Sequence, residues 1–171
     1  MRIFALYSAH MKFTNSRVFI NKLNNLFNGL IALPLVLVGL GYLEISSGSW
    51  TALMVPPQAL VVSTVMGLGV LVVYLSLRFK KETRSLTVLA TVQEKMVGYY
   101  RLATFYYGSV FALSILTTVC LYLFAHVAYA VVYAFILFWM SVFRPTLAHL
   151  AKLFNLKDEE KRQFINKEDL S

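Results

Sequence analysis

The sequence predicts an all-α integral membrane protein, a bundle of four spanning helices with both termini in the cytoplasm and amphipathic cytoplasmic helical extensions. Only 14% of its 171 residues are charged, against about 25% in typical soluble domains. The segment Leu23–Leu77 contains one charged residue, Glu44, and the segment Leu102–Phe143 contains none. Because one span needs roughly 20 apolar residues, each segment is long enough for two spans and a turn.

Prolines and short loops indicate where the spans begin and end. Pro34 removes a backbone donor inside the first span, so we expect a kink there. Pro56-Pro57 precede the second span, where proline suits the start of a helix. Only Ala125-His126-Val127 separate the third and fourth spans, which therefore form an antiparallel hairpin. The expected spans are residues 26–45, 58–77, 102–124 and 128–143.

The basic residues predict the orientation. Residues 1–22 hold four Lys and Arg, residues 78–101 hold six and residues 144–171 hold six, which accounts for all 16. Since basic loops stay in the cytoplasm, we expect residues 1–25, 78–101 and 144–171 there. The net charge is +8, but the basic residues flank apolar spans and form no patch on a soluble module. Nucleic acid is therefore not an expected partner. The size and composition are typical of a small protein of the bacterial inner membrane.

The N-terminal segment 1–25 does not resemble a secretory signal, because the first long apolar run starts near Leu26. Residues 1–10 precede a second methionine, Met11, and we interpret them as a start-site artefact.

Three cytoplasmic segments show amphipathic helical patterns. In residues 82–101 apolar side chains recur every three or four positions, and we expect one helix from about Ser85 through Phe124, roughly 60 Å long. A second apolar stripe follows Pro145, Asn155 is a plausible break, and a charged helix follows it. A third such helix is expected before the first span. These segments either pack on one another and on the membrane surface, or form a docking platform for a partner protein.

Two polar positions near the spans are candidate contacts. Glu44 is the only acid near a span, and acids inside membranes are usually functional; it is either an ion or partner contact or a solvated residue at the outer edge. Arg101 opens the third span beside tyrosines, and is either an arginine that reaches the inner surface or a contact for lipid or ligand. The tyrosines of this candidate contact are Tyr100, Tyr106 and Tyr107.

Small residues and hydroxyl groups within the spans suggest how the helices pack. Ser63, Gly67 and Gly69 let the second span approach another helix closely, within the chain or across an oligomer. The tyrosine hydroxyls need partners, and either bond between helices or line a polar path.

Several chemistries are not expected. Cys120 is the single cysteine, so an intrachain disulfide and a cysteine zinc site are excluded. Motifs of nucleotide hydrolysis, zinc proteolysis and serine hydrolysis are missing from the sequence. His126 and His149 lie at opposite ends of the fourth span, so one chain does not hold a haem between them, and no cofactor is expected. A histidine pair across a homodimer is the alternative that stays open.

The function expected from these features is that of a non-catalytic accessory, assembly or scaffold subunit, which binds another membrane protein or itself. The alternative is an oligomeric channel or transporter for a small solute or ion. A lipid-modifying enzyme is the third hypothesis, and no group of side chains in the sequence supports it.

Overall fold

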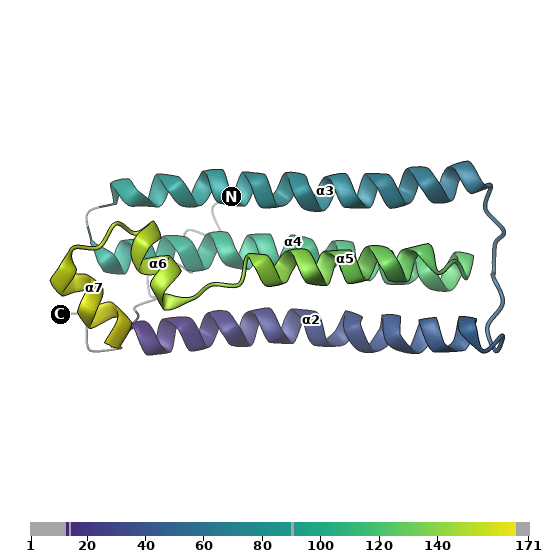
Figure 1. The fold of residues 1–171 in the computed structure, drawn as a ribbon, viewed down its shortest axis with the longest axis horizontal. Helices are drawn as coiled ribbons and strands as arrows, with labels where there is room; N and C mark the ends of the chain where they lie inside the picture. Colours follow the sequence, from purple (N-terminus) through teal and green to yellow (C-terminus); the bar gives the residue numbers. More distant parts are fainter. Residues whose placement is uncertain (1–12, 14, 90, 167–171) are drawn as a thin grey trace, which may run out of the picture. The chain divides into compact units, whose positions relative to one another are not determined.

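The computed structural model describes residues 13, 15–89 and 91–166, and every regular element in this part of the chain is a helix (Figure 1). The prediction of an all-α protein is therefore confirmed. The predicted start at Met11 falls outside the described residues. The elements are α2 (Ser16–Ser46), α3 (Gln58–Arg84), the 3₁₀ helix η1 (Ser85–Val88), α4 (Val92–Phe124), α5 (Ala128–Val142), α6 (Leu147–Leu153) and α7 (Asp158–Asn166).

The chain divides into two compact units. The apolar unit consists of residues 27–77 and 106–144. The basic unit consists of the chain up to Leu26, residues 78–105 and the chain from Pro145 onwards. The apolar unit contains only two charged residues, Glu44 and Arg144. The described part of the basic unit contains twelve Lys and Arg residues and five Asp and Glu residues. Most charged residues of the described chain thus belong to the basic unit.

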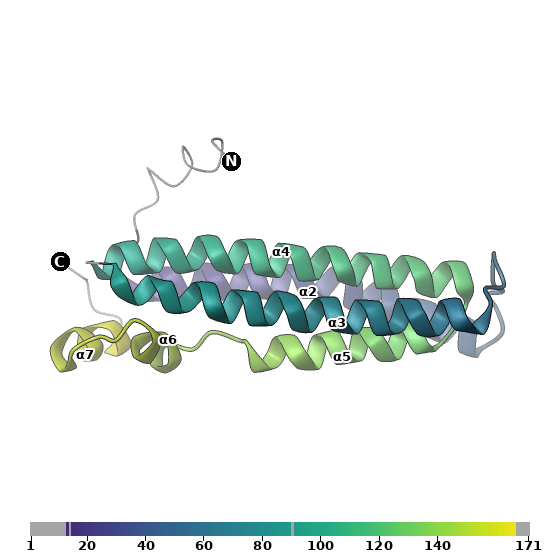
Figure 2. The same cartoon turned by 90° about the horizontal axis from the view of Figure 1, so that it is seen from above.

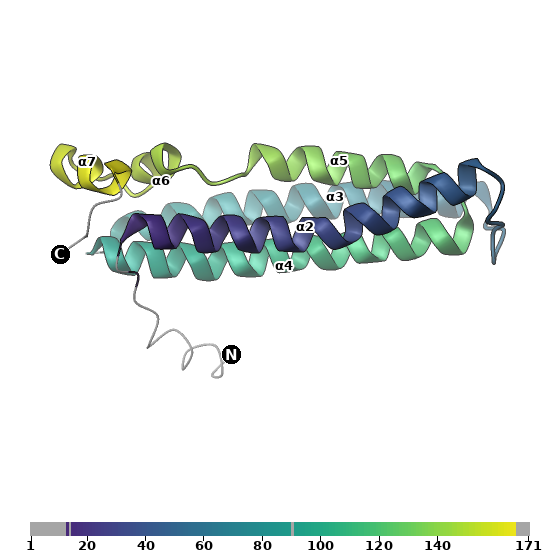
Figure 3. The ribbon, with the colours of Figure 1, turned by 90° about the horizontal axis from the view of Figure 1, so that it is seen from below.

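Within the apolar unit, segments of α2 and α3 lie between α4 and α5, as Figures 2 and 3 show. Its buried side chains include Val38, Val72, Val110, Leu121 and Ile136. Large apolar side chains also face outwards, among them Leu43 (63% exposed), Met66 (64%) and Phe138 (68%). An apolar exterior of this extent suits contact with lipid tails, because soluble proteins rarely expose large contiguous apolar patches.

Three helices are long and apolar enough to cross a membrane: α2, α3 continued by η1, and α4. A fourth candidate arises only if α5 and α6 are counted together as one broken span. Alone, the 15 residues of α5 rise by roughly 22 Å, less than the hydrocarbon core of about 30 Å. The helix ends at Val142 because Pro145 disfavours helical geometry at the residue before it, Arg144.

Helix ends agree with the sequence in most places. α3 begins directly after Pro56-Pro57, and α4 and α5 are separated by three residues, of which Ala125 has φ 46°. Asn155 has φ 52° between α6 and α7, which confirms the predicted break. α2 passes through Pro34 without interruption, so the expected interfacial helix and the first span form one element. The kink at Pro34 stays a prediction.

The expected helix from Ser85 through Phe124 is wrong. Residues 85–88 form η1, and α4 begins only at Val92. The reason is a reciprocal cap: Glu94 N donates to Thr91 Oγ1 (3.2 Å) and Thr91 N donates to Glu94 Oε2 (3.4 Å). A threonine followed three residues later by glutamate is a known signal for the start of a helix.

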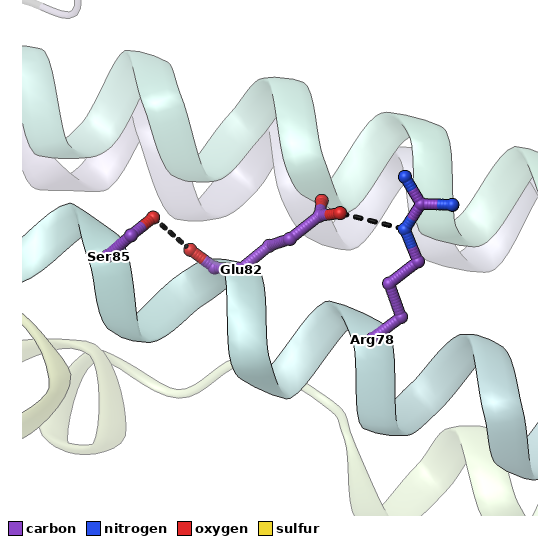
Figure 4. Close-up of polar contacts among 3 residues, drawn as sticks. All are labelled: Arg78, Glu82 and Ser85. Carbon is purple, nitrogen blue, oxygen red and sulfur yellow. Dashed lines mark hydrogen bonds and ion pairs between the residues drawn. The ribbon is translucent and has the colours of Figure 1, made fainter.

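The end of α3 carries its own polar contacts. Arg78 Nε donates to Glu82 Oε1 at 2.8 Å, one helical turn away, and Ser85 Oγ donates to the carbonyl of Glu82 at 2.7 Å (Figure 4). The Ser85 hydroxyl thereby gives a partner to one of the last carbonyls of α3, which a helix end otherwise leaves without one.

The basic unit has an aromatic core. Tyr99 packs edge-on against Phe19, Phe79 and Phe154, and Phe154 packs in turn against Phe164. Figures 1 and 3 show α7 beside the start of α2, where Ser16 Oγ donates to the carbonyl of Phe164 at 2.6 Å. The three amphipathic segments therefore pack on one another, as the first of the two interpretations expects.

Candidate functional site

The tyrosine hydroxyls of the apolar unit bond between helices. Tyr133 donates to the carbonyl of Ile31 (3.3 Å) and Tyr122 to the carbonyl of Leu37 (3.0 Å), both on α2. Ile31 lies in the turn before Pro34, where proline disturbs the backbone bonds of the helix. Tyr129 pairs with Thr64 Oγ1 of α3 (3.0 Å), and Tyr107 donates to the carbonyl of Phe143 (3.5 Å).

Ser76 is the most connected of these positions. Its hydroxyl donates to the carbonyl of Val72 at 2.8 Å and lies 2.8 Å from Trp139 Nε1 and 2.9 Å from the hydroxyl of Tyr106. Indole nitrogen is only a donor, and a serine hydroxyl has one hydrogen and two acceptor positions. Tyr106 is therefore the donor to Ser76, whose hydroxyl is fully bonded and joins α3, α4 and α5.

Gly41 is the position where α2 and α4 approach closely. A Cβ there would lie 2.9 Å from Cζ of Tyr122, so the ring needs glycine at this point. Trp50 packs edge-on against the same ring, and its Nε1 donates to the carbonyl of Tyr122 at 2.9 Å. The sequence alone does not single out Gly41 as a contact, because spacing does not reveal which helix lies opposite.

Glu44 is exposed near the end of α2. Its backbone carbonyl accepts hydrogen bonds from Ser49 N (3.0 Å), Trp50 N (3.2 Å) and Ser47 Oγ (3.1 Å). Within the described part of the chain its carboxylate has neither an ion pair nor a hydrogen bond. This placement agrees with a solvated edge residue and leaves the carboxylate accessible to an ion or partner.

In the described part of the chain, Gly67 and Gly69 make no close contact with another helix. Ser63 and Gly67 are exposed, and no described atom of another helix lies within 4 Å of a Cβ built at Gly67 or Gly69. Of the two arrangements expected for these residues, the contact within one chain is absent from the described structure. The contact across an oligomer stays a prediction.

The tyrosines expected beside Arg101 do not form a common surface. Tyr106 and Tyr107 are 2% and 0% exposed, and their hydroxyls are bonded within the apolar unit. Tyr100 is half-buried against the ring of Phe13 in the basic unit. Arg101 is exposed and lines an open groove of about 370 Å³ with Leu89, Gln93, Glu94, Val97 and Gly98.

The two histidines of the rejected haem site are both exposed. His126 Nδ1 accepts from Ala128 N at 3.2 Å, and the backbone N–H of His149 donates to Thr146 Oγ1 at 3.3 Å. In residues 13, 15–89 and 91–166, His, Cys, Asp and Glu form no group of three that suits a metal ion.

The helices described above are those of a multi-pass membrane protein, with three candidate spans or, if the broken pair is one span, four. Comparison with protein-family models, with curated proteins and with solved structures finds no match to this chain. The candidate sites are therefore interpreted from their chemistry alone.

Proposed function

We propose that this chain is a non-catalytic subunit of a membrane assembly, a scaffold that binds another membrane protein or a second copy of itself. The observation that carries the proposal is the use of polar groups in the apolar unit. The hydroxyls of Tyr106, Tyr122, Tyr129 and Tyr133 each bond to a neighbouring helix. Groups that bond helices together stabilise a fixed arrangement and are not available to a substrate.

The proposal includes a topology. The apolar unit is a four-helix bundle in the cytoplasmic membrane of a bacterium, and the basic unit and both termini lie in the cytoplasm. The charge difference between the units supports it: twelve basic residues in the described basic unit against Arg144 alone in the apolar unit. Positive charge near the ends of spans favours the cytoplasmic side.

Purification from the native source tests the scaffold proposal. The tagged chain is extracted in a mild detergent, with and without prior chemical cross-linking in the membrane, and its mass and partners are measured. We expect a stoichiometric complex with a second membrane protein, or a homo-oligomer of defined mass. A chain that runs as an isolated monomer in every preparation would contradict the proposal.

The alternative function is a channel or transporter, and the same purified protein can be used to distinguish it from a scaffold. The hydroxyls of Tyr106 and Tyr129 are bonded within one chain, so in this alternative the conducting path is lined between copies, with Glu44 as its exposed acid. Solute flux in liposomes that Glu44→Gln abolishes would favour transport over scaffolding. A homo-oligomer without flux across a panel of ions and small solutes would favour the scaffold.

A further inference from the structure

The groove beside Arg101 is formed by two elements of the basic unit. Gln93, Glu94, Val97, Gly98 and Arg101 lie along one side of α4, and Leu89, which follows η1, forms the facing wall. A Cβ at Gly98 would lie 2.8 Å from Cδ2 of Leu86, so glycine lets η1 pack directly on α4. The volume of about 370 Å³ falls within the range of small-molecule sites.

The polar groups of the groove other than Arg101 are already bonded. Glu94 accepts from the backbone of Thr91 at the start of α4. Gln93, with its amide oriented to satisfy both partners, donates to Phe13 O (3.0 Å) and accepts from Phe13 N (2.6 Å). Leu89 and Val97 are apolar. The groove therefore presents apolar walls, the exposed carboxylate of Glu94 at the start of α4 and a single basic group.

Arg101 is that group. Among the described residues, the ion pairs are Arg78–Glu82 and Arg162–Glu159, and Arg101 has no carboxylate within 4 Å. Glu94 is seven residues away on the same helix, a separation of roughly 10 Å along its axis. Arg101 is also the last charged residue before the uncharged segment Leu102–Phe143. A planar guanidinium with two parallel donors matches a phosphate group in charge and in geometry.

We propose that this groove binds one phospholipid with a net negative headgroup, such as phosphatidylglycerol. Arg101 donates to the lipid phosphate, and Leu89 and Val97 contact the first carbons of an acyl chain. The inference rests on the proposed topology, which places this end of α4 at the inner leaflet. Anionic lipids of that leaflet also attract basic segments in general; the groove adds a specific site to this attraction.

Native mass spectrometry of the detergent-solubilised full chain tests the proposal. Phosphatidylglycerol and phosphatidylcholine are added in equal amounts to wild type, Arg101→Gln, Arg101→Lys and Arg84→Gln. Arg84 is the matched control, because it is exposed at the end of α3 and does not line the groove. A fourth variant, Val97→Trp, fills the groove and keeps the arginine. Circular dichroism checks that each variant retains its helical content.

We expect wild type to retain one phosphatidylglycerol per chain in preference to phosphatidylcholine. Arg101→Gln lowers this affinity about tenfold, the usual weight of one charge-assisted contact, Arg101→Lys lowers it less, and Val97→Trp lowers it as well. Arg84→Gln leaves it unchanged. Equal retention by Arg101→Gln and wild type overturns the proposal, as does an equal loss in Arg84→Gln.

Displacement of the lipid by glycerol 3-phosphate at the same concentration also overturns it, because the acyl contacts would then contribute nothing. The result is independent of the scaffold proposal, since neither a partner nor an oligomer is needed for lipid retention. Failure of the proposed topology would be recognised separately, because the topology is tested by labelling of single cysteines in intact cells.

Discussion

The hydroxyl of Tyr106 lies 2.9 Å from Oγ of Ser76, and Trp139 Nε1 lies 2.8 Å from the same oxygen. Ser76 and Tyr106 are both buried, at 0% and 2% exposure. One serine thus serves two aromatic donors from two different helices, and its own hydrogen is used by Val72. In an apolar environment each of these donors costs free energy if it is left without an acceptor.

Ser76→Ala is predicted to destabilise the fold, because it removes the acceptor that Tyr106 and Trp139 share. Interhelical hydrogen bonds in membrane proteins contribute about 0.6 kcal/mol on average and up to about 1.7 kcal/mol. We therefore expect a loss of about 1–2 kcal/mol in the free energy of unfolding, measured by urea or detergent titration of the reconstituted protein. In a Trp50→Phe background, the fluorescence of Trp139 reports the lost bond directly.

Ser63→Ala is the matched control for Ser76→Ala. Ser63 is on the same helix, is exposed, and bonds only to the carbonyl of Leu60 in its own helix. Its replacement is expected to change stability by less than about 0.5 kcal/mol. Equal effects of the two variants would contradict the role assigned to Ser76.

Gly41→Ala is predicted to weaken the contact between α2 and α4. The new Cβ would lie 2.9 Å from Cζ of Tyr122, whose hydroxyl is bonded to Leu37 O. The ring must shift and its hydrogen bond lengthens, so we expect a cost of about 1–2 kcal/mol in the free energy of unfolding. Gly39→Ala is the control, because no described neighbour lies within 4 Å of its Cβ; it is expected to be neutral or stabilising, since alanine favours helix.

The helices and their apolar character were predictable from the sequence, because charge and hydropathy set the spans locally. α3 begins where Pro56-Pro57 indicate, and α4 and α5 meet at the short turn that was expected. The pairing of side chains was not predictable. From the sequence, the tyrosine hydroxyls could either bond between helices or line a polar path. Only the fold reveals that the hydroxyl of Tyr133 bonds to Ile31. It also reveals that Gly41, rather than Gly67, lies against an aromatic ring.

The start of α4 could have been found with existing rules. Thr91 and Glu94 have the spacing of a capping box, yet the continuous apolar stripe from Leu86 to Ala103 favoured an uninterrupted helix. The stripe was right about burial, since Met96, Tyr99 and Ala103 are 0%, 3% and 0% exposed. The prediction of one continuous helix was wrong, because residues on either side of the break between η1 and α4 can be buried in the same core.

Thr91→Ala is predicted to fray the start of α4. It removes the oxygen that accepts from Glu94 N, at a cost of about 1 kcal/mol. Hydrogen exchange of the amides of residues 92–96 is expected to accelerate, while the exchange of residues 106–124 is unchanged. Thr87→Ala is the control, since Thr87 Oγ1 bonds only to the carbonyl of Arg84 in the preceding turn. Unchanged exchange at residues 92–96 in Thr91→Ala would refute the cap.

The number of spans is decided by the side of the membrane on which His149 lies. With α5 as a complete span, His149 is cytoplasmic like Ser85; if only three helices cross, it lies outside with Ser49. All three side chains are exposed. In a Cys120→Ala background, we make Ser49→Cys, Ser85→Cys and His149→Cys, and treat intact cells with a membrane-impermeant maleimide.

We expect labelling of Ser49→Cys alone, and labelling of the other two variants only after the cells are opened. Although the 15 residues of α5 are fewer than the usual 20, a short span is accommodated when the bilayer thins or when flanking residues extend to the interface. Arg144 lies two residues after the end of α5 and is suited to that role, because its long side chain can reach the interface. Labelling of His149→Cys in intact cells would instead mean that α5 does not cross, and that the basic residues after Pro145 face outwards against the charge rule.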